Sequence, residues 1–357
     1  MPLPFFSSQP KKRDQIISID LGGRTTKAIQ LQRQNGGFVL QGYCLLDAPI
    51  FEKSLSVELL TEHLKNVAQA LDAKTKLTTL AIGVGDSVVR TTEMPQIPIP
   101  DMRQILKLNA KTYMQQDMAG HVFDCSIIQS RHEPKAAEKA KLIQEGRKQK
   151  VLVAGARKQL IDDLLTAMKN TGMIPDHIVP SVIGPVNAFE LAMPDAFEKE
   201  VVALVDIGFK NSTICILLEG ELILSRVVAI GGDHLTTGLA ESMNISYAEA
   251  EGIKVGMPHE VQNDLEMLVK PLGRELRASV DFFEHQQDRP VGQVFMSGGS
   301  ARSEFIVKIL ESELLVPCNT WNPLASIQLS LPPQQSAEVN HIALQLSVAI
   351  GAAAASF

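Results

Sequence analysis

The sequence predicts an α/β protein built from two related halves. Apolar runs typical of strands alternate with amphipathic stretches typical of helices, which indicates α/β organisation. Two similar strand–turn–strand units, at residues 16–31 and 201–218, each end an apolar run in an aspartate and follow it with glycine and hydroxyl residues. This repetition predicts a duplicated fold that closes on one ligand.

Length and composition describe an ordinary globular chain. Its 357 residues are enough for two domains with sizeable cores. The formal net charge of −6 disfavours a nucleic-acid surface, because duplex binding depends on Lys and Arg that neutralise phosphates. The four cysteines are scattered, as in proteins with reduced thiols. No run approaches the roughly 18 apolar residues of a membrane span, so we expect neither a nucleic-acid partner nor a direct membrane span.

The first half begins as a series of strands. In order, the sequence predicts a flexible leader (1–13), strands across 16–46, an amphipathic helix over 57–71 and a strand over 79–83. We assign residues 14–84, 173–199 and 330–357 to a first domain.

A stretch with three prolines, at residues 94–100, interrupts this pattern and suggests the start of a separate module. The elements expected around it are a helix over 101–118, strands near 122–129 and 151–155, and a helix around 160–168 ended by Gly172. Residues 130–150 are dense in charge and lack aromatics, which is typical of a solvated loop. We predict that residues 85–172 form a small inserted α+β subdomain.

The second domain is predicted over residues 200–329, with a helical subdomain at 236–290. Pro271 lies inside this helical region and predicts a kink or a new helix start. Further expected elements are strands over 201–206, 221–230 and 291–296, a helix over 303–315 and an apolar, alanine-rich helix over 341–355. The last helix is short for a membrane anchor, so we interpret it as a core helix.

Three glycine turns are candidates for holding phosphate or a flat ligand. Glycine lets the backbone approach a ligand closely, and successive N–H groups in such turns bind anions. The candidate residues are Asp20, Gly22, Gly23, Arg24, Thr25 and Lys27 in the first turn, Asp206, Gly208, Asn211 and Thr213 in the second, and Gly298, Gly299 and Ser300 in the third. Each turn taken alone also fits a common hairpin or helix start.

Asp20 and Asp206 are the candidate metal residues, since each ends an apolar strand beside a glycine turn. Mg²⁺ takes one or two carboxylates and keeps most of its waters, so we expect both to contact it through water. Glu251 and Lys254 are three residues apart and share one helix face. A surface ion pair would explain them equally, but all four motifs in one chain favour a single nucleotide site.

The ordered motifs resemble those of the actin-like ATPase superfamily, which has two phosphate loops, an adenosine loop and a Glu/Lys helix. Within it, the chain is similar to the PilM family of type IV pilus assembly proteins, relatives of the division protein FtsA. The resembling stretches are residues 19–27, 205–213, 226–236, 250–254, 274–279 and the position of the inserted module. The resemblance implies an actin-like ATPase fold with two duplicated domains around a nucleotide cleft, ATP and Mg²⁺ as cofactors, and Gly231 and Gly232 beside the nucleotide.

The resemblance also implies a function. It implies a cytoplasmic ATP-binding scaffold, held at the inner face of the cell membrane by its partner. The implied partner is the cytoplasmic N-terminal peptide of a PilN-like inner-membrane protein, which we expect to bind between the first domain and the inserted module. Pilus motor components and a homo-oligomer are further partners under this hypothesis.

Two departures from the superfamily pattern bear on activity. Gly23 and Arg24 stand in the first phosphate turn, where relatives usually carry serines. Residues 178–181, where ATPase relatives tend to have a carboxylate near the attacking water, have none, and Asp176 is the nearest. We therefore expect at most slow ATP hydrolysis and name no catalytic residue.

Two other functions stay open at this stage. A sugar-type kinase of the same superfamily would need a general base beside the γ-phosphate, and no isolated Asp or His clearly serves. An FtsA-like filament-forming protein would scatter light when ATP is added. The inserted module and the motif order across the whole chain favour the scaffold.

Overall fold

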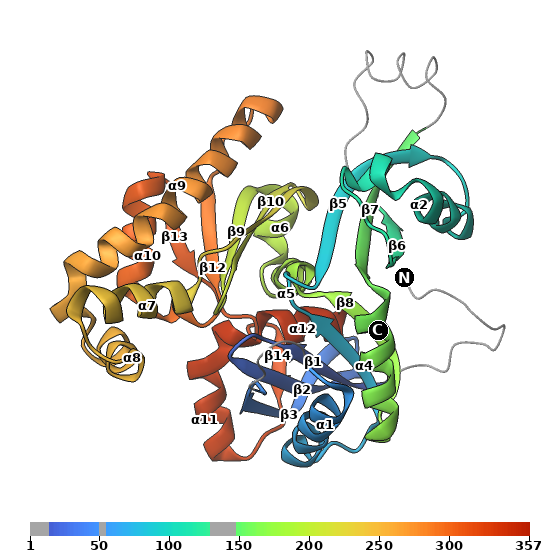
Figure 1. Ribbon diagram of the computed structural model, residues 1–357, viewed down its shortest axis with the longest axis horizontal. Helices are drawn as coiled ribbons and strands as arrows, with labels where there is room; N and C mark the ends of the chain where they lie inside the picture. The colour runs from blue at the N-terminus through green and yellow to red at the C-terminus, as the bar shows by residue number, and fades with distance from the viewer. Residues whose placement is uncertain (1–13, 50–54, 129–147) are drawn as a thin grey trace.

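The computed structural model describes residues 14–49, 55–128 and 148–357 and shows two lobes with an additional module (Figure 1). The predicted leader, residues 1–13, and most of the charged segment 130–150 lie outside the described residues. Among the helices that are described, none is both long and apolar enough to cross a membrane. The four cysteines are buried and unpaired.

The first lobe is built on a six-stranded sheet. Its strand order is β14 (Ile327–Leu329), β3 (Gly37–Asp47), β2 (Thr25–Gln34), β1 (Gln15–Leu21), β4 (Leu77–Ile82) and β8 (Ile174–Pro180). The strands β1, β2 and β3 form an antiparallel meander, and β4 and β8 join in parallel on the side of β1. Because β14 pairs with β3 in this sheet, the first lobe resumes slightly before the predicted boundary at residue 330.

The second lobe repeats this plan. Its sheet has the order β11 (Glu221–Val228), β10 (Ser212–Leu218), β9 (Val201–Ile207), β12 (Gln293–Ser297) and β13 (Cys318–Thr320). Here β9, β10 and β11 form the antiparallel meander, and β12 and β13 join in parallel beside β9. The strand β9 therefore corresponds to β1, and Asp206 corresponds to Asp20, which is the duplication that the two Asp-x-Gly hairpins predicted.

The helices form three groups, which pack on the first sheet, between the two sheets and on the second sheet. The helices are α1 (Val57–Leu71) and α4 (Lys158–Asn170); α5 (Gly184–Ala192), α6 (Pro194–Lys199), α11 (Pro333–Ile342) and α12 (Ser347–Ala354); and α7 (Gly232–Met243), α8 (Tyr247–Gly256), α9 (Gln262–Gln287) and α10 (Glu304–Leu314). The first pair packs on the first sheet, and α7, α9 and α10 pack on the second. The helices α5, α6, α11 and α12 contribute to a core shared by both sheets, so the lobes are joined by apolar packing behind the cleft.

The helices α5 and α12 touch through their backbones. A Cβ atom at Gly351 would lie 1.8 Å from the carbonyl oxygen of Gly184, and one at Gly184 would lie 2.6 Å from Val348 Cα. Only glycine permits so close a contact. The alanine-rich segment is thus a core helix, as we interpreted it. However, it does not run from 341 to 355, because a 3₁₀ turn at Ala343–Leu346 separates α11 from α12.

The inserted module has its own sheet and core. Its antiparallel strands are ordered β5 (Ser87–Pro95), β7 (Lys148–Arg157) and β6 (His121–Ile127), and α2 (Ile99–Met114) covers them. Its buried side chains are Met94, Met102, Leu106, Met114, Met118, Cys125, Val151 and Val153. The helix α4 also lies within the predicted insertion, but its buried face packs with α1 in the first lobe.

The module also contacts the second lobe. Its strand β5 lies beside β11, and Lys150 Nζ in β7 lies 2.6 Å from Glu221 Oε1 at the start of β11. The Glu221 side chain is only 3% exposed, so the Lys150 ammonium neutralises a carboxylate that is almost completely buried. The module therefore bridges the two lobes on the side away from the helices α7 to α10 (Figure 1).

The helical subdomain places α8 at the cleft and packs α9 on the core of the second lobe. A capping box between Ser246 and Glu249 begins α8, which satisfies free N–H groups at its first turn. The helix α9 runs as one element through Pro271, so of the two predicted outcomes, a kink or a new helix start, the new start does not occur. Its buried residues on both sides of the proline, Val269 and Leu272, hold it against the core.

Candidate functional site

A cleft of about 840 Å³ lies between the two lobes. The predicted site residues that line it are Asp20, Gly22, Gly23, Arg24, Thr25, Lys27, Gly208, Asn211, Gly232, Glu251, Lys254, Gly298, Gly299 and Ser300. Asp206, Thr213 and Gly231 are not among the lining residues, although Asp206 is partly exposed. Residues far apart in the sequence, from both hairpins and from α8, thus meet in one concave space.

The first hairpin brings Asp20 and Lys27 together. They are direct partners in the β1–β2 ladder, and Lys27 Nζ lies 3.0 Å from Asp20 Oδ2. Burial lowers the pKa of Lys27, but attraction to the Asp20 carboxylate outweighs this and leaves the pKa raised. A Cβ atom at Gly22 would lie 2.5 Å from the Thr25 carbonyl oxygen, so the tight turn between the two strands requires glycine.

The second hairpin holds Asp206 at the junction of the lobes. Its Oδ1 accepts hydrogen bonds from Ser297 Oγ at 2.8 Å and from Ser347 Oγ, at the start of α12, at 3.2 Å. Burial raises the pKa of Asp206, and these bonds together with the charge of Lys27 offset the effect only in part. Thr213 is the ladder partner of Asp206 and is buried, so it supports the turn rather than lining the cleft.

The remaining glycines shape the walls. Gly298 has φ of +91°, and a Cβ atom there would lie 2.5 Å from the Ile207 carbonyl oxygen. Its N–H donates to the Leu344 carbonyl, 2.8 Å away, in the 3₁₀ turn before α12. A Cβ atom at Gly231 would lie 2.3 Å from the Phe209 carbonyl oxygen, so Gly231 packs directly on the second hairpin and leaves Gly232 to face the cleft.

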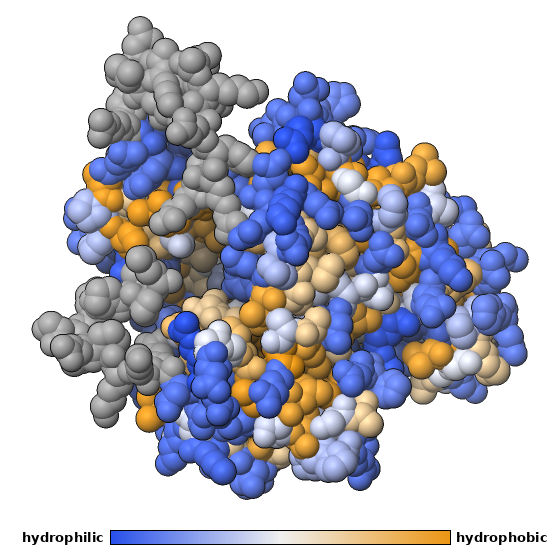
Figure 2. Space-filling model, turned by 180° about the vertical axis from the view of Figure 1, so that it is seen from behind, coloured by the Kyte–Doolittle hydropathy of each residue, from blue (hydrophilic) through white to orange (hydrophobic). Residues whose placement is uncertain are grey.

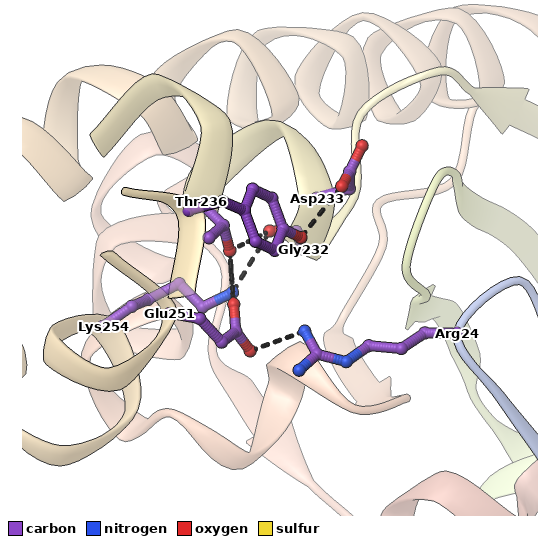
Figure 3. Close-up of polar contacts among 7 residues, drawn as sticks. Arg24, Gly232, Asp233, Thr236, Glu251 and Lys254 are labelled. Carbon is purple, nitrogen blue, oxygen red and sulfur yellow. Dashed lines mark hydrogen bonds and ion pairs between the residues drawn. The ribbon is translucent and has the colours of Figure 1, made fainter. Parts of the chain in front are cut away.

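A polar network joins α7, α8 and the first hairpin (Figure 3). Lys254 Nζ lies 2.7 Å from Glu251 Oε2 and donates to the Gly232 carbonyl, 3.1 Å away. The Thr236 hydroxyl also donates to the Glu251 carboxylate. From the other lobe, Arg24 Nη1 lies 2.9 Å from Glu251 Oε1. The predicted Glu251–Lys254 pair therefore exists, and it is extended across the cleft by Arg24.

Burial and pairing act in opposite directions on this network. Burial lowers the pKa of Lys254. The bond to Glu251 raises this pKa by a smaller amount, so it stays below its ordinary value. Burial also raises the pKa of Glu251, but the bonds from Lys254 and Thr236 outweigh this and leave it lowered. Glu251 is therefore held as a carboxylate, an acceptor for hydroxyl or amino groups of a ligand.

The sequence analysis missed Phe209 and Lys210, which line the cleft, and the side chains that contact Lys210 beside it. The Lys210 ammonium lies 2.7 Å from Asp233 Oδ2, and Tyr247 Oη donates to the other oxygen of Asp233 at 2.9 Å. Burial, reinforced by Asp233, raises the pKa of Tyr247 to about 12. Phe209 and Lys210 belong to the second hairpin motif itself, so their position in that turn could have identified them as residues of the cleft.

Asp86 is a further missed carboxylate. It lines the cleft just after β4, which runs parallel to β1, and burial raises its pKa, although Arg157 opposes this. Parallel strands have their carboxyl ends at the same edge of a sheet, and residues that follow those ends commonly form binding sites. The sequence Gly83-Val84-Gly85-Asp86, which follows a predicted strand, could have indicated this position. Ser181, at the end of the neighbouring β8, also lines the cleft.

The donor set suits a ligand that brings its own oxygens. In the part of the chain that the structure describes, no three His, Cys, Asp or Glu side chains cluster closely enough to hold a metal by themselves. The cleft instead offers a few carboxylates together with Arg24, Lys27, Lys210 and Lys254. Such a set fits Mg²⁺, which keeps several waters and is commonly bound together with phosphate oxygens.

Two duplicated lobes that close on a cleft lined by paired Asp-x-Gly hairpins define an actin-like ATPase fold. The structure is similar to that titled PilM-PilN type IV pilus biogenesis complex, with a TM-score of 0.81 and 20% identity, over 96% of this chain and 98% of that one. It is also similar to MreB5 of Spiroplasma citri bound to AMPPNP, with a TM-score of 0.51 and 12% identity, over 96% and 95% of the two chains.

The family described as type IV pilus assembly protein PilM matches residues 18–357, and the chain belongs to this family. Among curated proteins, the cell division protein FtsA of Bacillus subtilis is 22% identical over 263 residues, 68% of this chain and 58% of the relative. FtsA of Rhizobium meliloti is 32% identical over 79 residues, 21% and 18% of the two chains. The chain thus spans less than two thirds of the length of these curated relatives.

Proposed function

We propose that this chain is an ATP-binding scaffold of type IV pilus assembly, which captures the cytoplasmic end of a PilN-like inner-membrane protein. The observation that carries the proposal is the pair of Asp-x-Gly hairpins at one cleft, each ending a strand at the same place in its sheet. Membership of the type IV pilus assembly family supports the same assignment. Attachment at the inner face of the membrane, and contacts with pilus motor components or further copies of the chain, belong to this proposal.

The residues of the cleft fit Mg²⁺-ATP. Asp20 and Asp206 would hold the hydrated metal, and Lys27 would neutralise phosphate charge beside them. The backbones of Gly22, Gly23, Gly208 and Gly298 would cradle the phosphates. A Cβ atom at Gly299 would meet no atom closer than 3.9 Å, which leaves room for a flat group. Glu251 and Lys254 would face the adenosine. Bound nucleotide would supply the phosphate charge that these cations are arranged to neutralise.

Calorimetry tests the nucleotide site. Titration with Mg²⁺-ATP should show binding to the full chain, and Asp20→Ala should weaken it by at least about tenfold, since charge-assisted contacts of this kind are strong. Asp195→Ala is the matched control, because Asp195 is an exposed aspartate on α6 that pairs with Lys199 and lies outside the cleft lining. Equal affinities for Asp20→Ala and the wild-type chain would show that the first hairpin does not take part in nucleotide binding.

The partner site is proposed at the junction of the inserted module and the first lobe. The similar structure is a complex of PilM with PilN, and extended peptides commonly bind at exposed sheet edges. The strands β5 and β6 are the outer strands of the module sheet. Seen from behind, hydrophobic residues gather on the module, at the upper left, next to a recess above the first lobe (Figure 2). These features suit a peptide with apolar anchors.

A defined deletion tests this site. Arg90 and Val153 are ladder partners of β5 and β7, so replacing residues 91–152 with Asn-Gly should close a two-residue hairpin. The deletion spares α4, which packs with the first lobe. The shortened chain should still bind Mg²⁺-ATP but should no longer capture a synthetic N-terminal peptide of the PilN-like protein. Capture by the shortened chain would place the partner elsewhere.

A further inference from the structure

Arg24 connects the two lobes across the mouth of the cleft. It lies at the tip of the β1–β2 hairpin, and its Nη1 contacts Glu251 Oε1 of α8 at 2.9 Å. Its guanidinium carbon also lies 5.7 Å from the centre of the Phe209 ring, within the range of a cation–π contact. Arg24 therefore spans the space between the first hairpin and the second lobe (Figure 3).

The two sides of Glu251 differ in how firmly they are held. Its Oε2 is bound by Lys254, whose side chain is 11% exposed, whereas the Arg24 side chain is 46% exposed. Ion pairs as exposed as that of Arg24 contribute little to stability. Arg24 can thus leave Glu251 at small cost, while Lys254 keeps the carboxylate charged and in place.

The other paired cations of the cleft are bound within their own lobes. Lys27 pairs with Asp20 in the same hairpin, and Lys210 pairs with Asp233 in the second lobe. Arg24 is the one of this group whose partner lies in the opposite lobe. A guanidinium also matches phosphate oxygens in a two-pronged geometry that an ammonium lacks. A polyphosphate that enters the cleft would therefore compete effectively for Arg24.

We propose that Arg24 is an exchangeable clasp, which binds Glu251 in the nucleotide-free protein and moves to the phosphates when a nucleoside polyphosphate binds. The exchange frees Glu251 Oε1 to accept a hydrogen bond from a sugar hydroxyl. Arg24 thereby favours polyphosphates and disfavours nucleosides, since a nucleoside must displace the arginine without offering it a new partner. This inference rests on the proposed nucleotide site.

The test compares Mg²⁺-ATP with adenosine, by calorimetry on the full chain. Arg24→Ala should weaken ATP binding by about tenfold or more, the scale of a lost charge-assisted contact, yet leave adenosine binding unchanged or tighter. Arg24→Lys should fall between Arg24→Ala and the wild-type chain for ATP. Arg289→Ala, an exposed arginine just after α9 and outside the cleft lining, should change neither affinity.

Opposite effects on the two ligands distinguish a clasp from a structural role. If Arg24→Ala weakens ATP and adenosine by the same factor, or leaves ATP unchanged, the clasp is refuted while the nucleotide site stands. If the wild-type chain binds neither ligand, the proposed function fails and the clasp fails with it.

Discussion

Lys27 stands directly opposite Asp20 in the β1–β2 ladder, with its ammonium 3.0 Å from the aspartate carboxylate. Both side chains are largely buried, at 16% and 7% exposed. The first hairpin therefore carries a nearly buried ion pair at the point where its turn meets the cleft. Either partner alone would be an unpaired charge in a poorly hydrated place.

Replacing Lys27 should destabilise the fold. Lys27→Met leaves Asp20 without its cation, and breaking a buried pair in this way costs about 3 kcal/mol. The double variant Asp20→Asn, Lys27→Met should recover much of that loss, and the exposed Lys169→Met should stay within about 0.5 kcal/mol of the wild-type chain. Urea unfolding measures all three. A single Lys27→Met as stable as the control would show that the pair carries no such cost.

The same lysine gives a pH dependence of stability. Its folded-state pKa is raised above the ordinary 10.5, so its contribution is fully present below that value and is lost as the pH rises through the raised pKa. Unfolding free energy measured between neutral pH and strong alkali should fall more steeply for the wild-type chain than for Lys27→Met. Parallel curves would argue against the raised pKa.

Asp206 should make metal-nucleotide binding depend on pH in the acid range. Its pKa is raised from the ordinary 3.8 by burial, and a protonated carboxyl cannot serve a metal. Affinity for Mg²⁺-ATP should therefore increase as the pH rises from about the ordinary value through the raised pKa, and the increase should be smaller in Asp206→Asn. A titration series at several pH values checks this, and an affinity that falls over the same range would contradict it.

ATP turnover should be slow. Ser181, rather than a carboxylate, follows β8 at the cleft, and a positioned general base is worth about 10²–10⁴-fold in rate. Phosphate release should stay well below the roughly 1–100 s⁻¹ of kinases. Asp86→Asn should reduce any residual turnover, because Asp86 is a carboxylate that lines the cleft just after β4, the strand next to β8. Rapid turnover that is indifferent to Asp86→Asn would contradict both statements.

Gly351→Ala should destabilise the chain by about 3 kcal/mol or more, as overpacking does, because the new methyl group would overlap the Gly184 carbonyl. Gly252→Ala in α8 is a matched control: a Cβ atom there meets nothing within 4 Å, and alanine should stabilise the helix by about 0.5–1 kcal/mol. Thermal unfolding of both variants would show the opposite signs. Equal effects would mean that the α5–α12 contact is looser than the structure has it.

Local patterns predicted the elements whose partners lie nearby. The helix over 57–71 has the predicted bounds, since its apolar spacing alone defines a buried face. The duplication followed from the Asp20 and Asp206 hairpins, because similar short motifs form similar turns. By contrast, β14 has three residues and pairs with Phe38–Leu40, so its place depends on a contact almost 290 positions away that no local pattern records.

Tertiary contacts also decided the remaining differences. The predicted helix at 341–355 is divided by a turn whose Leu344 carbonyl accepts the Gly298 N–H, and Pro271 stays within α9 because its buried neighbours hold the helix on the core. The Arg24–Glu251 pair joins positions more than 220 residues apart. Spacing could identify Glu251 and Lys254 as neighbours on a helix, but not the arginine that reaches them from the other lobe.

The Lys150–Glu221 pair connects the inserted module to the second lobe. Since Glu221 is almost fully covered, the module cannot shift relative to β11 without exposing an unpaired carboxylate. A displacement of the module would therefore act on the sheet that carries Asp206. Thermodynamic linkage is reciprocal: a peptide that repositions the module changes nucleotide affinity by the same factor by which nucleotide changes peptide affinity. Under the proposed function, two ligands that do not touch would influence each other through the contact between the module and β11.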